Sequence, residues 1–151
     1  MSTTDTPPTL AEVRSGLEDF ALEAAPAREV FAGRLEPDPN GSSWGWDSLR
    51  RKIRQAIEAM ETGVSAWSAD VQILEPAPSD VQEAVRLYEA LRRAITAADF
   101  LVYGAANVPG STSVDVDAFR ERVLDKRDAM KALRARMETY ADDYPAVAVR
   151  P

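Results

Sequence analysis

The apolar residues of this chain recur at alternating steps of three and four over three long stretches. These stretches cover residues 53–74, 81–105 and 116–144. A seven-residue repeat of this kind places its apolar side chains along one seam of an α-helix. The pattern therefore predicts an all-α protein, an antiparallel up-down bundle of three long heptad-patterned helices.

A shorter helix is predicted before these three. Thr9 and Glu12 have the spacing of a capping box, which marks a helix start. Apolar residues then repeat on one face until Pro26, which cannot occupy a helix interior without breaking the backbone ladder. We therefore expect a proline-broken N-terminal helix as the fourth member of the bundle.

Prolines and turn residues place the ends of the longer helices. The second helix is expected from about Asp47 to Leu74, the third from Ser79 to about Val108, and the fourth from near Ser113 or Asp115 to just before Pro145. No stretch alternates as a strand would. At 151 residues the chain is expected to form one domain over residues 9–144, between a flexible tail of residues 1–8 and a C-terminal tail of residues 145–151.

The amino-acid composition limits the kinds of catalysis and metal binding that the chain can support. The chain contains neither cysteine nor histidine, which removes thiolate and imidazole catalysis and most zinc sites. We therefore predict no catalytic residue, no metal site and no cofactor. The net charge of −7 argues against binding to nucleic acids or to anionic membranes, both of which attract positive surfaces. The N-terminal residues lack the basic and apolar segments of a signal peptide, so a cytoplasmic protein is expected, whether free or built into a particle.

One charged residue interrupts the third seam, and one interrupts the apolar end of the second. Lys126 stands where the third seam requires an apolar residue, and Asp99 is the one charge in residues 95–106. An antiparallel hairpin about the turn at 108–113 brings Asp99 level with residues 123–127. We therefore predict a buried Asp99–Lys126 ion pair that fixes the register of the two helices. The alternatives are a ligand-binding carboxylate and simple exposure of Asp99.

Two groups of residues are candidates for binding a partner. Tryptophans and cations gather around the start of the second helix, which is expected from about Asp47, and tryptophan is frequent at interface hot spots. The last helix alternates charges with a basic excess, which suits an acidic neighbour. The candidates are Trp44, Trp46, Arg50, Arg51, Lys52 and Arg54 in the first group, and Arg127, Lys131 and Arg134 in the second. The alternative for the first group is a tryptophan-capped bundle end beside a solvated basic face.

These observations favour a non-enzymatic protein that acts through protein–protein contacts, with another protein or with a second copy of itself. It would be a structural, assembly or adaptor subunit of a larger complex, such as a phage-type particle. The alternative is a small-molecule or regulatory binding module. A further alternative, a magnesium-dependent nucleotide hydrolase, rests on Glu58 and Glu61, three residues apart on one helix, with Glu83 and Glu89 on the next.

Overall fold

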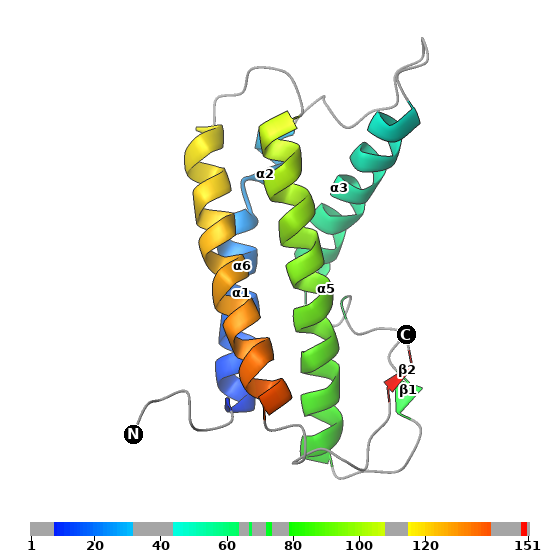
Figure 1. Cartoon of the computed structure of the whole chain (residues 1–151), viewed down its shortest axis with the longest axis vertical. Helices are drawn as coiled ribbons and strands as arrows, with labels where there is room; N and C mark the ends of the chain where they lie inside the picture. Colours follow the sequence, from blue (N-terminus) through cyan, green and yellow to red (C-terminus); the bar gives the residue numbers. More distant parts are fainter. Residues whose placement is uncertain are drawn as a thin grey trace.

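The computed structural model describes residues 8–31, 44–63, 67, 72–73, 79–107, 115–139 and 149–150 (Figure 1). Within these ranges the fold is helical apart from two short strands, and four of the helices pack against one another. They are α1 (Leu10–Ala24), α3 (Trp44–Thr62), α5 (Ser79–Asn107) and α6 (Val116–Thr139), with the one-turn α2 (Ala27–Val30) following α1. None of the helices in these ranges carries an apolar stretch long enough to cross a membrane.

The N-terminal helix forms as its capping residues predict. The Glu12 backbone N–H donates to the Thr9 hydroxyl at 3.0 Å, and the Thr9 backbone N–H donates to the Glu12 carboxylate at 3.2 Å. The helix then breaks at Ala25 and Pro26 before α2 begins. Because proline has no backbone N–H to continue the helical ladder, the break lies where the sequence places it.

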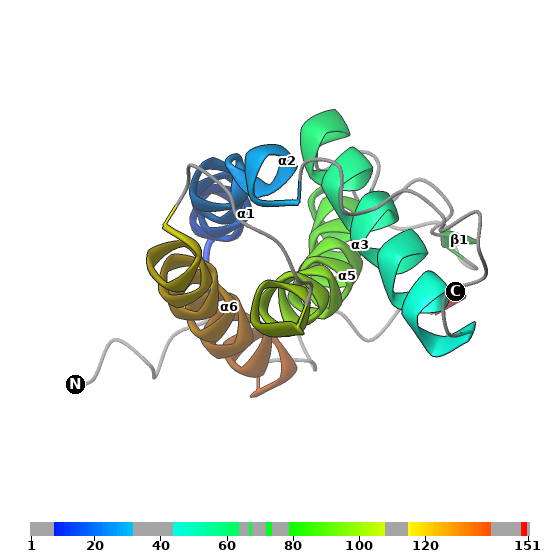
Figure 2. The same cartoon turned by 90° about the horizontal axis from the view of Figure 1, so that it is seen from above.

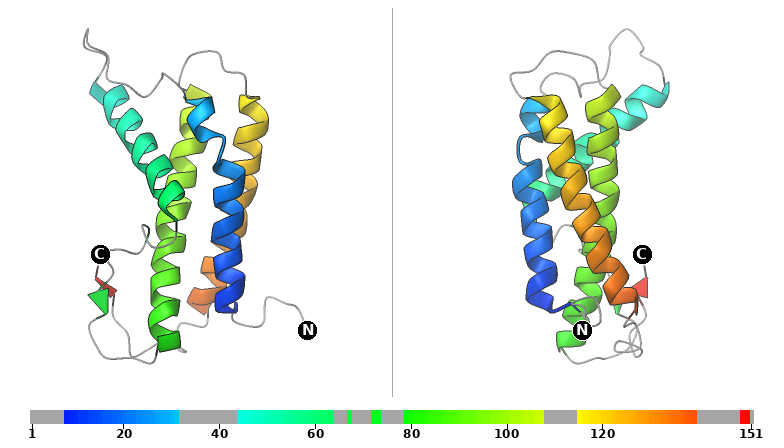
Figure 3. Two further views of the ribbon diagram at one scale, coloured as in Figure 1. Left: turned by 180° about the vertical axis from the view of Figure 1, so that it is seen from behind. Right: turned by 60° about the vertical axis from the view of Figure 1, so that its left-hand side comes forward.

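Helix α5 is the central element of the fold. It contacts α1, α3 and α6, and Figure 2 shows it between α6 and α3 with α1 across from them. This position explains why α5 is exposed along one stripe only, which includes Arg86, Asp99 and Tyr103. Figure 3 shows α1, α5 and α6 lying along one another, whereas α3 crosses α5 at an angle.

The buried core is built from the apolar positions that the sequence repeats. Within the described ranges, most of the predicted seam residues are buried, and the others are partly covered. At one end of the molecule, Phe31 and Phe119 meet edge to face, with ring centroids 6.4 Å apart. Such a contact fixes the chain that follows α2 against the start of α6.

Helix α3 ends earlier than predicted. Its last residue is Thr62, not Leu74, although Trp67 of the same apolar repeat is still buried. Gly63 follows with φ of 100° and donates its backbone N–H to the Ala59 carbonyl at 2.9 Å. A glycine in the left-handed region is a common helix terminator, so it overrides the apolar repeat here.

Two short strands replace part of the expected helix and tail. Residues β1 (Gln72–Ile73) pair antiparallel with β2 (Val149–Arg150), so that Gln72 faces Arg150. The prediction of a helix over 72–74 is therefore wrong for Gln72 and Ile73. The expected C-terminal tail also contributes a paired segment. Residues 1–7, 145–148 and 151 of the expected tails lie outside the described residues, and Pro8 is buried.

Candidate functional site

The basic residues of α3 lie farther along the helix than the sequence indicates. Because α3 begins at Trp44 instead of Asp47, the cations at positions 50–54 occupy its second and third turns. They therefore stand away from the free amides of the first turn. Arg51 and Lys52 are exposed, while Arg50 and Arg54 are partly buried.

Lys52 also touches the central helix. Its Nζ lies 5.2 Å from the centroid of the Phe100 ring, which is the geometry of a cation–π contact. Trp44 and Trp46 form the first turn of α3, and their side chains lie outside the described part of the chain. The predicted tryptophan anchor therefore stays a prediction.

The predicted cations of α6 differ in their surroundings. Arg127 donates from Nη1 to Asp99 at 2.9 Å and from Nη2 to Asp128 at 3.0 Å. Arg134 forms an ion pair with Glu138 at 3.6 Å, whereas Lys131 is exposed. The two carboxylates beside Arg127 raise the pKa of its guanidinium, so it keeps its charge.

The predicted buried pair of Asp99 with Lys126 is wrong in its cation and in its burial. Asp99 binds Arg127, and its side chain is 53% exposed. The level along the helix was right, because Arg127 lies within the predicted stretch of 123–127. The face was wrong, because one residue along an α-helix turns the side chain by about 100°. Lys126 points elsewhere, and its own ion pair is a 4.0 Å contact with Asp125.

Two contacts fix the register of α5 against α6. Arg127 binds Asp99, and the Tyr88 hydroxyl donates to Glu138 at 2.8 Å. The same step of eleven residues separates the two contacts on each helix, so the helices run in opposite directions without a slip, as Figure 1 shows. Burial, together with the bond to the Glu138 carboxylate, raises the pKa of Tyr88 and keeps its hydroxyl protonated as the donor.

A second set of contacts fixes the position of α6 along α1. Arg136 donates to Glu12 at 2.9 Å, and this hydrogen bond lowers the pKa of the Glu12 carboxyl. One turn farther, a Cβ built on Gly16 would lie 2.6 Å from Leu133 Cδ1, so the two helices approach closely there. Continuing in the same sense brings the end of α1 level with Lys126.

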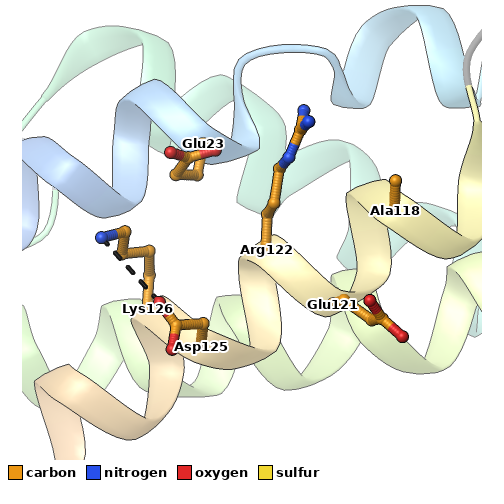
Figure 4. Close-up of a pocket in the computed structure, with 6 residues that line it drawn as sticks. All are labelled: Glu23, Ala118, Glu121, Arg122, Asp125 and Lys126. Atoms are coloured by element: carbon orange, nitrogen blue, oxygen red, sulfur yellow. Dashed lines mark ion pairs between the residues drawn. The ribbon is translucent and has the colours of Figure 1, made fainter.

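An open pocket lies at this level between α1 and α6. Its volume is about 420 Å³. In Figure 4, Arg122 and Lys126 extend from α6 toward α1, and Glu23 stands opposite them on α1. Ala118, Glu121 and Asp125 complete the lining. The interrupted seam was the sequence signal for this pocket, whereas Glu23 and Arg122 carried no signal of their own.

Sequence reasoning also missed a buried carboxylate. Glu89 on α5 is 5% exposed. The Nε of Arg92 donates to it at 3.0 Å and that of Arg93 at 2.9 Å. These hydrogen bonds, Arg92 first, lower the pKa of Glu89 despite its burial. Arginines three and four residues later were the available signal.

The carboxylates considered for magnesium are separated by their partners. Glu61 is bound by Arg28, and Glu83 by Arg14. Across the described ranges, no group of three or more acidic side chains lies close enough together to hold a metal ion. Comparisons of the chain with protein-family models, with curated proteins and with solved structures found no match.

Proposed function

We propose that this chain is a non-enzymatic structural or assembly subunit that acts through protein–protein contacts, and that its first partner is a second copy of itself. In this proposal the chain is an antiparallel up-down bundle whose heptad seams are buried within the fold. Contacts with a neighbour then use the outer faces of its helices. The arrangement of charge on those faces supports the proposal.

The position of α3 is the observation that carries the proposal. Figure 1 shows its N-terminal half standing away from α1 and α6. This half contains the basic segment of Arg50, Arg51, Lys52 and Arg54, and residues 48–57 include no acid. Its exposed cations, Arg51 and Lys52, are suited to an acidic surface on a chain of net charge −7.

Helix α1 offers such a surface. Leu22 is 73% exposed, which is unusual for a large apolar side chain in a packed helix. Glu18 and Asp19, one turn before it, are also exposed, and among the described residues neither forms an ion pair. An exposed apolar residue beside carboxylates without partners resembles one half of an interface with a basic partner.

The basic segment of α3 and the acidic face of α1 are different surfaces of one molecule. A contact between two copies therefore joins unlike faces. It closes as a symmetric dimer if both contacts form at once, and it extends to a chain or ring if they do not. Because both faces are solvent-exposed, added salt screens the attraction between them.

Charge reversal on each face tests the proposal. We expect Arg51→Glu to lower the self-association of the chain at least tenfold. Arg86→Glu is the matched control, since it reverses an exposed arginine on α5 with the same change in net charge. Asp19→Lys should weaken association as Arg51→Glu does, by removing the complementary face. Sedimentation velocity measures all three variants.

Mixing the variants separates the pairing of unlike faces from a general effect of charge. A mixture of Arg51→Glu and Asp19→Lys contains one intact basic face and one intact acidic face, so association should return in the mixture. If Arg86→Glu weakens association as much as Arg51→Glu does, or if the mixture stays dissociated, the two faces do not bind each other.

A further inference from the structure

Lys126 remains unexplained by the packing of the bundle. It occupies a seam position between Val123 and Met130, both of which are buried. An apolar side chain here would add to the core, because each buried methylene contributes about 0.8 kcal/mol. Lys126 keeps its side chain 29% exposed and lines the pocket between α1 and α6. A polar residue that costs packing and opens a pocket is typical of a binding site.

Among the described residues, the charges of the pocket are only weakly paired with one another. Within the described part of the chain, Arg122 and Glu23 form no ion pair, and Lys126 has only the 4.0 Å contact with Asp125. Figure 4 shows both cations extending toward α1 with Glu23 opposite them, whereas Glu121 and Asp125 lie farther from α1. The α1 side of the pocket therefore receives two cations and one carboxylate, while Glu121 and Asp125 line its α6 side.

The two cations and Glu23 together favour a ligand that carries both a negative and a positive group. A carboxylate between Arg122 and Lys126 would gain two charge-assisted hydrogen bonds. A ligand that carried only an anion would place its charge near Glu23, and one that carried only a cation would meet the two cations of α6. A molecule with both groups satisfies all three side chains. The pocket has a volume of about 420 Å³ and is open to solvent, so it suits a small ligand that stays partly exposed.

We propose that this pocket binds a small zwitterionic amino-carboxylate, with its carboxylate on Arg122 and Lys126 and its ammonium on Glu23. Glu23 lies one turn after Asp19 on α1, so this site adjoins the proposed acidic face. The proposal does not rest on self-association, and its ligand is expected to bind the monomer.

Ligands of one length and different charge test the proposal. We would titrate the full chain with 4-aminobutyrate, butyrate and butylamine, and with glycine and 6-aminohexanoate to vary the distance between the charges. Chemical shifts of the backbone amides of residues 23, 122 and 126 report binding. At least one amino-carboxylate should bind saturably, with a Kd on the order of 1 mM. A ligand of the same length that carries only one of the two charges should bind at least tenfold more weakly than this amino-carboxylate.

Variants assign the binding to the pocket. Glu23→Gln, Arg122→Gln and Lys126→Met should each weaken the amino-carboxylate at least tenfold. Lys131→Met, an exposed lysine on the same helix outside the pocket, is the matched control and should bind as the wild type does. Lys126→Met should also melt at a temperature no lower than the wild type, because methionine suits the seam.

Three results would overturn the proposal. They are the absence of saturable shifts with every amino-carboxylate, binding of butyrate as tight as that of 4-aminobutyrate, and undiminished binding in the three pocket variants. Glu23 and Arg122 are not core residues, so their variants still test the pocket even if Lys126→Met fails to fold.

Discussion

At the scale of single residues, the contact between Asp99 and Arg127 locks the helices in register without being buried. Asp99 is 53% exposed and Arg127 is 26% exposed in their side chains. Water competes for both groups, and ions screen them. Their contribution to the free energy of unfolding is therefore that of a surface pair rather than that of a buried one.

A double-mutant cycle measures this difference. With Asp99→Asn, Arg127→Gln and the double variant, we expect a coupling free energy of about 0.2–1 kcal/mol in chemical denaturation. The coupling should shrink further in about 1 M salt. A coupling of about 3 kcal/mol or more, typical of a broken buried pair, would contradict the exposed geometry.

Glu89 is both buried and charged. Because its pKa in the folded chain is lowered from 4.5, the unfolded chain binds the proton more tightly than the folded chain does. The stabilisation it provides is complete above the unfolded pKa and is lost as the pH falls through the folded pKa. The relevant window therefore lies below about pH 4.5.

We expect Glu89→Gln to lower the free energy of unfolding by about 1–3 kcal/mol at neutral pH. The variant should also lose part of the wild-type dependence on pH in the acidic window. Glu58→Gln, at an exposed position of α3, is the control and should stay within about 0.5 kcal/mol of the wild type. An unchanged acid profile in Glu89→Gln would show that Glu89 does not contribute in this window.

At the scale of elements, the sequence predicted which helices form but not where each ends or which neighbour each residue faces. The capping box at Thr9 and Glu12, the break at Pro26 and the start at Ser79 depend on local chemistry, so they were readable. The end of α3 depends on a competition between an apolar repeat and one glycine, and only the structure shows that the glycine prevails.

The misplaced ion pair has a different cause. Helix α6 packs against both α1 and α5. A seam residue such as Lys126 can therefore face either helix, and a seven-residue period does not say which. For the same reason the pocket could be predicted only as an interruption of the seam. Its opposite wall, Glu23, comes from α1 and is distant in the sequence.

Gly63, which follows the last residue of α3, leads to a prediction about how this helix is terminated. Its φ of 100° is costly for a residue with a Cβ, and a Cβ there would meet no other atom within 4 Å, so backbone strain is the whole effect. We expect Gly63→Ala to lower the free energy of unfolding by about 1 kcal/mol. Gly63→Asn should lose less, because asparagine tolerates the left-handed region better. Equal stability of all three chains in thermal melting would show that Gly63 does not end the helix by its conformation.

At the scale of the whole molecule, the interior accounts for the fold, and the surface carries the features of the proposed contacts. The interior follows from the apolar repeats, whose side chains fill the space around α5. The surface has a basic segment on α3, an acidic face with exposed Leu22 on α1, and a charged pocket between α1 and α6. These three features lie outside the buried core, and the proposed contacts use them.

The mass of the chain in solution tests the central claim most directly. One chain weighs 16.5 kDa. Sedimentation of the wild type at about 20 mM salt should give an average mass that exceeds this value and rises with concentration, and it should return toward the monomer at about 500 mM salt. A mass of 16.5 kDa at every concentration up to about 100 μM in low salt, or a larger mass that salt does not alter, would contradict self-association through the charged faces of α1 and α3.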